Sequence, residues 1–472
     1  MFDLKNKLIY QIVLALSQVL FPIVSIPIVS SNIGPEGLGK IGFIEYLTGL
    51  VFTIFSFGVS YYGTREVARK RSNQNELSSF TSELTTLHLI LVSIGLPIFI
   101  ILSSLNLDYK SDPELMILGC VYLLSQVFSF EWYLNGLEDF RFIAKRNILT
   151  RLLGLALIIL LVKKKEDYLL YYSIIVTTQL AISIGTFFYI KSNTNIKLSI
   201  RKFKTHTKSL YAFAVTSSAI SIYVFFDTII LSFYENDDRV GFYTLAIKIA
   251  KLPLLFLLIL NNLLFPRLSF YAANNYDEHI KTLQKNTLNF LILITLPLCS
   301  GIYALAPEII RLIAGKEFES SIYVLKILSP IPFIVTLINF ISLQILFPRK
   351  KETKFAVTTF IGAIVSIILF FILIPIAREK GAAIATLSTE SAILIICTIS
   401  SWKYISELIC IKSLCYSIIL SIIPVLIAII ISRFLFSDLY NIITTSLVSA
   451  FIYFFIQIRI IKNKYALIYR NI

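Results

Sequence analysis

Long apolar segments, repeated along almost the whole chain and separated by short polar turns, constrain the fold of this protein more than any other feature. Hydrophobic residues make up 57% of the 472 residues and charged residues only 15%, which excludes an ordinary water-soluble domain and a disordered chain. The segments lack the polar–apolar alternation of outer-membrane strands, and only helices and closed barrels satisfy the backbone in lipid. The sequence therefore predicts an all-α polytopic membrane protein.

The segments that are long enough to cross a bilayer predict about fourteen transmembrane helices. We expect them at residues 8–30, 41–63, 84–107, 114–137, 147–162, 168–190, 209–233, 240–265, 288–306, 320–347, 355–375, 382–402, 413–433 and 441–461. Pro330 and Pro332 should bend or break the helix that contains them, because proline cannot donate a backbone hydrogen bond.

The distribution of lysine and arginine predicts the orientation. If the N-terminus lies in the cytoplasm, about two thirds of the 43 basic residues fall in inner segments, as the positive-inside rule requires. Both termini are then cytoplasmic, and the basic run Lys163 to Lys165 is the exception on the outer side. Since topology accounts for the net charge of +15 and no nucleic-acid motif is present, we expect no nucleic-acid partner.

Two short strings indicate an internal repeat. Ile41-Gly42-Phe43 and Val240-Gly241-Phe242 each open a predicted span directly after an outer turn. Repeats of this kind are common in transporters. We therefore predict an N-terminal six-helix lobe at 1–208, a C-terminal six-helix lobe at 209–408 and two additional transmembrane helices at 409–472.

Two lysines stand inside the apolar segment 240–265. A charged side chain at the centre of a transmembrane helix costs about 2.5–3.5 kcal/mol, so Lys248 and Lys251 should face protein or water and not lipid. Their spacing of three places both ammonium groups on one side of a helix, which predicts a polar cavity lined by cations. Two alternatives stay open: the lysines reach an interface, or they pair with Asp227, which lies at a similar depth.

Other charged residues inside or beside predicted spans are further candidates. Arg65, Arg151 and Lys326 are candidates for binding an anionic substrate, although Arg151 could equally extend to the inner interface. Asp227, Glu131 and Glu390 are intramembrane carboxylates that could pair with these cations or bind a coupling proton or sodium ion.

Catalytic motifs are missing from the sequence. We find no phosphate-binding loop, no nucleophile elbow and no metal-ligand spacing, and the five cysteines form no CxxC pair. The connections between the spans are too short for a catalytic domain. We therefore expect no enzyme activity, no catalytic residue, no metal and no cofactor, which leaves binding and movement.

Several strings in register resemble one family of transporters. They comprise Asn32-Ile33-Gly34-Pro35-Glu36-Gly37-Leu38-Gly39, Phe57-Gly58, Thr64-Arg65-Glu66-Val67-Ala68-Arg69, Glu131-Trp132-Tyr133-Leu134-Asn135-Gly136-Leu137-Glu138, Lys165-Glu166-Asp167-Tyr168, Asp227, Val240-Gly241-Phe242-Tyr243, Pro266, Ala314-Gly315, Gln344 and Gly381-Ala382-Ala383. In order and spacing they resemble the polysaccharide transport family, the O-antigen and capsule flippases of the multidrug/oligosaccharidyl-lipid/polysaccharide exporter superfamily.

This resemblance implies a function and a location. It implies a multi-pass protein of the bacterial inner membrane that moves undecaprenyl-diphosphate-linked oligosaccharide, an O-antigen or capsule repeat unit, across the bilayer by alternating access. Its partners would be the lipid-linked oligosaccharide diphosphate, a coupling proton or sodium ion, and membrane lipid. A cationic central cavity suits a diphosphate headgroup. The alternatives are a multidrug or toxin cation antiporter of the same superfamily, which would want carboxylates facing its substrate, and a membrane polysaccharide polymerase, which would need a catalytic loop.

Overall fold

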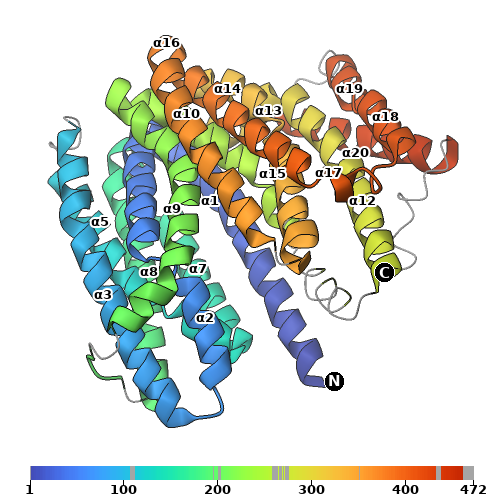
Figure 1. Cartoon of the computed structure of the whole chain (residues 1–472). Helices are drawn as coiled ribbons and strands as arrows, with labels where there is room; N and C mark the ends of the chain where they lie inside the picture. The colour runs from blue at the N-terminus through green and yellow to red at the C-terminus, as the bar shows by residue number, and fades with distance from the viewer. Residues whose placement is uncertain are drawn as a thin grey trace. The chain divides into compact units, whose positions relative to one another are not determined.

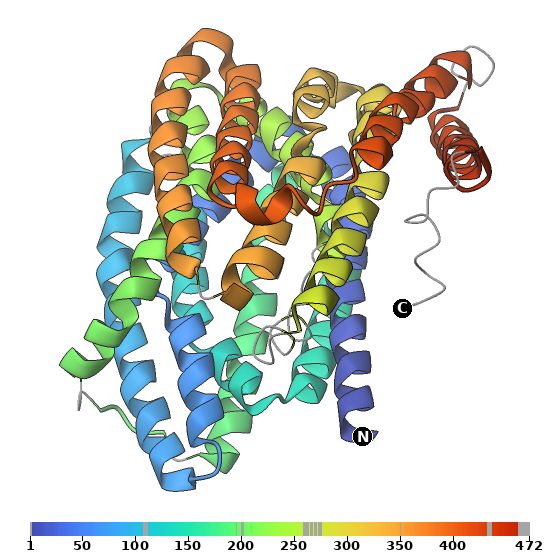
Figure 2. The same cartoon turned by 45° about the vertical axis from the view of Figure 1, so that its right-hand side comes forward.

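The computed structural model describes residues 2–106, 112–194, 196–199, 203–257, 264, 268, 271, 276–349, 351–431 and 437–460. Within these ranges the chain forms helices and no strands, so the predicted all-α class is confirmed. Figures 1 and 2 show the helices from two directions. The chain packs as two compact units, Met1–Gly241 and Phe242–Ile472. The predicted lobe boundaries at 208 and 408 stay a prediction.

The first unit consists of long helices joined by short turns. Its helices are α1 (Phe2–Phe55), α2 (Val59–Lys70), α3 (Gln74–Leu105), α5 (Pro113–Val127), α6 (Glu131–Leu137), α7 (Phe140–Leu161), the 3-10 turn η1 (Lys165–Asp167), α8 (Tyr168–Asn193), α9 (Phe203–Tyr234) and the beginning of α10 (Asp237–Lys251). In both views α3 and α5 run side by side. The Asn73 side chain caps α3 by accepting hydrogen bonds from the backbone amides of Asn75 and Glu76.

The second unit begins within α10 and contains more interrupted helices. They are α12 (Asp277–Ala304), α13 (Ala306–Ala314), η2 (Lys316–Phe318), α14 (Ser320–Leu328), α15 (Ile331–Phe340), the π-helix η3 (Ile341–Leu346), η4 (Phe347–Arg349), α16 (Glu352–Ser400), α17 (Trp402–Ile405), α18 (Ile411–Leu420), α19 (Ile423–Ile431), α20 (Asp438–Phe455) and the π-helix η5 (Ile456–Ile460). As predicted, Pro330 and Pro332 interrupt their span, because α14 ends at Leu328 and α15 begins at Ile331.

Within the described residues, 11 helices are long and apolar enough to cross a membrane, so this is a multi-pass membrane protein. Two of them each cover two predicted spans. The backbone of α1 leaves the helical region at Gly34 (φ 70°), and that of α16 leaves it at Arg378 (φ 56°). The helix α7, which covers the predicted span 147–162, is not among the 11. The count of about fourteen stays a prediction.

The predicted span 240–265 differs from the structure. The helix α10 begins at Asp237 and ends at Lys251, and a turn at Leu252 and Pro253 follows it. The ring of Pro253 cannot donate a backbone hydrogen bond, which explains the break. Lys248 and Lys251 therefore share the last turn of α10, and residues 237–257 together are long and apolar enough to form one span.

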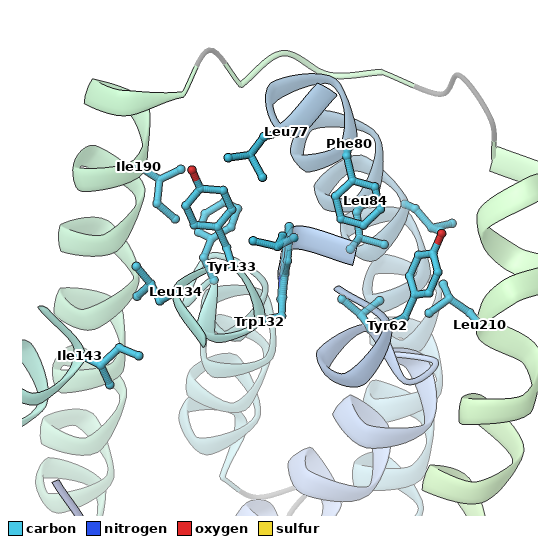
Figure 3. Close-up of a cluster of buried hydrophobic side chains, with 14 residues drawn as sticks. Tyr62, Leu77, Phe80, Leu84, Trp132, Tyr133, Leu134, Ile143, Ile190 and Leu210 are labelled. Carbon is cyan, nitrogen blue, oxygen red and sulfur yellow. The ribbon is translucent and has the colours of Figure 1, made fainter. Parts of the chain in front are cut away.

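An aromatic core fixes the short helix α6 in the first unit. Figure 3 shows Trp132 and Tyr133 of α6 among apolar side chains of α2, α3, α7, α8 and α9. Glycine permits this packing, because a Cβ atom on Gly63 would lie 2.8 Å from the Trp132 ring and one on Gly136 would lie 2.6 Å from the Val67 side chain. The close contact of α2 with α6 fixes the position of Glu131, the first residue of α6.

Candidate functional site

The break between α5 and α6 creates a polar position inside an apolar bundle. Phe130 stands at the break with φ 46°, although its side chain is fully buried. Such a conformation costs a residue other than glycine about 1–3 kcal/mol, and it persists only when surrounding contacts impose it. The break leaves the Ser129 carbonyl outside the regular helix and begins α6 at Glu131, so an acceptor and a carboxylate lie close together.

Arg146 of α7 binds at this break. One guanidinium nitrogen, Nη1, donates to the Ser129 carbonyl at 3.3 Å and to Thr186 Oγ1 at 2.6 Å, and Nε donates to Asn147 Oδ1 at 3.0 Å. The third guanidinium nitrogen, Nη2, lies 2.5 Å from Glu131 Oε1. The Arg146 side chain is 5% exposed and that of Glu131 is 45% exposed. The guanidinium is therefore held from three sides, while water still reaches the carboxylate.

Arg151 extends this group of residues toward α1. Its Nη1 donates to Ser17 Oγ at 3.0 Å, and its guanidinium lies within electrostatic range of both Glu131 and Arg146. We call the group Ser17, Ser129, Glu131, Arg146, Asn147, Arg151 and Thr186 the Arg146 cluster. It contains two guanidinium groups and one carboxylate, so it has a net positive charge and can attract an anion.

Arg146 is the residue that the sequence interpretation missed. Arg146 stands one residue before the predicted span 147–162, whereas α7 begins at Phe140 and includes it. Arg146 thus links two of the predicted candidates, Glu131 and Arg151. The signal that could have found it is the run of polar residues Arg146, Asn147 and Thr150, which recurs at helical spacing before Arg151.

The other two candidates of the first unit lie apart from this cluster. Arg65 of α2 is 47% exposed, with Nε 3.4 Å from Glu66 Oε1 and the guanidinium 5.7 Å from the centre of the Tyr62 ring. Asp227 of α9 is fully buried. Its Oδ1 accepts hydrogen bonds from the Thr228 amide at 2.6 Å and the Thr228 hydroxyl at 3.2 Å.

The lysines of α10 belong to the second unit. Lys248 and Lys251 are both half-buried. The beginning of the helix is anchored by a hydrogen bond of 2.9 Å between Tyr243 Oη and Thr386 Oγ1 of α16. Glu390 lies one helical turn beyond Thr386 and is 9% exposed. The pairing of Asp227 with Lys248 stays a prediction.

Lys326 of α14 lies against an aromatic ring. Its Nζ is 5.5 Å from the centre of the Tyr303 ring on α12, and the side chain is half-buried. A cation over a ring face is stabilised by about 0.5–2 kcal/mol, depending on its exposure to water. This contact explains how an ammonium group is accommodated there, and the predicted role in substrate binding stays a prediction.

An apolar cavity of about 330 Å³ lies in the second unit between α12, α13, α19 and α20. Its lining includes Pro297, Leu305, Pro424 and Phe454, with Thr445 and Tyr453 among the few polar side chains. The lining contains no charged side chain, and its polar groups are the hydroxyls of Thr445, Ser446, Ser449 and Tyr453, so it offers no cation to an anionic headgroup. The charged candidates are therefore the ones that bear on headgroup binding.

Comparisons with known proteins agree with the predicted resemblance. Residues 4–272 match a family described as polysaccharide biosynthesis protein. A protein of Escherichia coli (strain K12) named for O-antigen transport is 22% identical over 410 residues, which cover 82% of this chain and 94% of the relative.

Two solved structures share the fold. A lipid II flippase, MurJ, in an inward closed conformation superposes with a TM-score of 0.67 at 16% identity, covering 97% of this chain and all of the flippase. An outward-facing multidrug resistance transporter of the MATE family, from the MOP superfamily, gives a TM-score of 0.54 at 15% identity, covering 85% of this chain and 94% of the transporter. At these identities the likeness concerns the fold alone. Because the family match covers more than half of the sequence, the chain belongs to the polysaccharide biosynthesis protein family.

Proposed function

We propose that this protein is a flippase that moves an undecaprenyl-diphosphate-linked oligosaccharide from the inner to the outer leaflet of a bacterial inner membrane. Three observations support the proposal: the family membership, the relative named for O-antigen transport over most of both chains, and the multiple apolar helices. The substrate would be an O-antigen or capsule repeat unit. We propose no catalytic step, because the transported lipid keeps its covalent structure.

One observation carries the mechanism: two half-buried lysines share the last turn of the apolar helix α10. A diphosphate headgroup is anionic and loses its hydration on entering the membrane. Two unit charges 4 Å apart attract by about 1 kcal/mol in water and about 4 kcal/mol at an effective dielectric constant near 20. Lys248 and Lys251 would therefore stabilise the headgroup in a cationic cavity, while the polyprenyl tail stays in lipid.

The remaining candidates have proposed places on the same path. Arg65, exposed near the middle of α2, would make the first contact with the phosphates, and Arg151 would extend that contact along the Arg146 cluster. Lys326 would bind the headgroup at the predicted outer side. Asp227, Glu131 and Glu390 would hold these cations or bind a coupling proton or sodium ion. Both termini would lie in the cytoplasm.

The multidrug transporter in the comparison has the same fold, so the fold does not distinguish export of a cationic drug from flipping of an anionic lipid. The two lysines of α10 favour the anionic lipid. A cationic drug near Lys248 and Lys251 would meet two like charges, which disfavour binding. A drug-resistance assay in the same cells is therefore a useful second arm of the test.

The test is complementation in a strain whose own flippase for the same polysaccharide has been deleted. The double variant Lys248→Ala, Lys251→Ala should abolish the surface polymer and leave lipid-linked repeat units inside. Lys→Arg at both positions should retain part of the activity, since the charge stays but the donor geometry changes. The matched control is Lys163→Ala, Lys164→Ala, which removes two exposed lysines and should leave the polymer unchanged. A well-expressed Lys248→Ala, Lys251→Ala protein that restores wild-type polymer would refute the cationic mechanism, and drug resistance without polymer would refute the function.

A further inference from the structure

Three buried polar side chains from three helices of the first unit form a continuous hydrogen-bonded chain. His206, near the beginning of α9, contacts Tyr62 Oη of α2 through Nδ1 at 2.9 Å and Glu83 Oε2 of α3 through Nε2 at 3.0 Å. Tyr62, Glu83 and His206 are 6%, 4% and 5% exposed, so all three are removed from water. A buried carboxylate in direct contact with an imidazole requires an explanation beyond packing, because burying a charged group is costly unless it is paired.

The same turns of α3 also hold the segment that leads into α9. The Lys197 amide donates to Ser82 Oγ at 3.1 Å, and the Ser199 amide donates to Thr86 Oγ1 at 2.9 Å. Ser82 and Thr86 flank Glu83 in the sequence, and Ser79 Oγ donates to Glu83 Oε1 at 3.1 Å. This part of α3 therefore binds both the connection to α9 and the first turns of α9. Among these contacts, the hydrogen bond between Glu83 and His206 is the one in which the imidazole can take up a second proton.

Aromatic rings surround the imidazole. The Phe80 and Tyr62 rings lie 5.6 and 5.9 Å from the His206 ring, each edge-on. Two cations contact these rings. Lys70 Nζ lies 5.1 Å from the Phe80 ring centre, and the Arg65 guanidinium lies 5.7 Å from that of Tyr62.

Both of these cations have a carboxylate partner. Glu66 of α2 lies 2.7 Å from Lys70 Nζ and 3.4 Å from Arg65 Nε. Further along α3, the second buried histidine, His88, contacts Ser56 Oγ through Nε2 at 3.0 Å. On α9 itself, Asp227 lies 21 residues beyond His206, or about 32 Å along the helix. Among the side chains that the structure describes around His206, the Glu83 carboxylate is the charged group in direct contact with it.

We propose that Tyr62, His206 and Glu83 form the binding site for the proton that drives transport. This inference rests on the proposed flippase function, which left the coupling ion open between proton and sodium. With His206 neutral, Nε2–H donates to Glu83 and Nδ1 accepts from the Tyr62 hydroxyl, so the site has the charge of the carboxylate. Uptake of one proton at Nδ1 neutralises the pair, and the Tyr62 hydroxyl turns to accept from Nδ1–H.

Protonation then strengthens the attachment of α9 to α3. Because the carboxylate is ionised in both states, protonation adds the attraction between two opposite charges to the existing hydrogen bond. By linkage, any conformation that separates the beginning of α9 from α3 binds the proton less tightly and releases it. Proton uptake in one conformation and release in the other is the requirement for coupling. A sodium ion would instead need several oxygen ligands, and the imidazole cannot supply them.

The first experiment measures the proton on the histidine without transport. The chain has three histidines, so ¹⁵N labelling of histidine alone in the purified full-length protein gives three sets of ring signals. The variants His206→Gln, His88→Gln and His279→Gln assign them. The signals are recorded between about pH 8 and pH 5, and we expect those of His206 to change from the neutral to the doubly protonated pattern and the Glu83→Gln variant, which lacks the negative charge, to respond differently from the wild type. Signals of His206 that stay constant over this range would overturn the proposal.

The second experiment separates this inference from the function itself. Proteoliposomes contain the protein and a fluorescent undecaprenyl-diphosphate-linked N-acetylglucosamine, and a gradient of one pH unit is applied across their membrane. If one proton is coupled to each lipid, this gradient produces about a tenfold difference in probe concentration between the two leaflets. We expect the wild type to show this dependence, and His206→Gln to flip the probe without it. Flipping by the wild type that follows a sodium gradient and ignores pH would refute the proton site and leave the flippase intact. No flipping under any gradient would refute the proposed function.

Discussion

Gly39 of α1 and Gly241 of α10, both in the first unit, take part in one close backbone contact. A Cβ atom on Gly39 would lie 1.9 Å from the Asp237 carbonyl oxygen and 3.0 Å from the Gly241 amide nitrogen. One on Gly241 would lie 2.0 Å from the Pro35 carbonyl oxygen. The strings from Asn32 to Gly39 and from Val240 to Tyr243, which resemble the transporter family, are thus partners in one backbone contact.

Replacing Gly39 by alanine should destabilise the protein. The added methyl group overlaps backbone atoms, which cannot move aside as a side chain can, so we expect a loss of about 1–3 kcal/mol or more. The matched control is Gly185→Ala in α8, where a Cβ atom would meet nothing within 4 Å and should change stability by less than about 1 kcal/mol. Thermal unfolding of both variants in detergent measures the difference, and equal stabilities would contradict the close contact.

The topology of the first unit can be tested with single cysteines. Ser72 lies just before the beginning of α3, and Asn236 lies just after the end of α9. The end of α9 is near the end of α3, because the Asn106 side chain, directly after α3, donates a hydrogen bond of 2.8 Å to the Ser232 carbonyl of α9. Since α3 has 32 residues, the two positions lie about 48 Å apart along it. Both are exposed. In a cysteine-free background, an impermeant thiol reagent should label Ser72→Cys only from the cytoplasm and Asn236→Cys only from outside. Labelling from one side alone would invalidate the predicted orientation.

The contact between Arg146 and Glu131 should show energetic coupling. Glu131→Ala leaves a buried guanidinium without its carboxylate, and we expect a loss of about 1–3 kcal/mol, below that of a fully buried pair because water reaches Glu131. Arg146→Met should cost less, since the remaining carboxylate can be hydrated. The double variant should be more stable than the sum of both losses predicts. Arg141→Met, at an exposed position of the same helix, is the control. Strict additivity in thermal unfolding would show that the pair contributes nothing.

The similar predicted depths of Asp227 and Lys248 imply functional coupling between them. Asp227→Asn should impair complementation, because it removes a fully buried negative charge. Combining it with Lys248→Gln should cost less than the two single losses together, since the combination leaves neither charge without its partner. Polymer measured per unit of expressed protein is the readout. A double variant whose loss equals the sum of the single losses would remove this pairing.

The sequence gives part of the candidate site and misses the rest for a physical reason. The high cost of a charge in lipid singles out Glu131 and Arg151 without any structure, because each stands in an apolar segment. Arg146 escapes this reasoning because it stands beside other basic residues at the end of a segment, where topology explains it equally well. Glu83 and His206 escape it because 123 residues separate them, and a contact at that distance in the chain leaves no local pattern.

By itself the sequence determined the helical class, the membrane location and the family, because apolar length and the order of short strings are properties of the chain alone. It also located the break at Pro330 and Pro332, since proline acts on its own backbone. The tertiary structure decided which polar groups meet. Only packing brings Arg146 to the Ser129 carbonyl at the break before α6, and only the approach of α9 to α3 places His206 on Glu83. These contacts depend on where whole helices lie, and the spacing of residues along one helix cannot specify that.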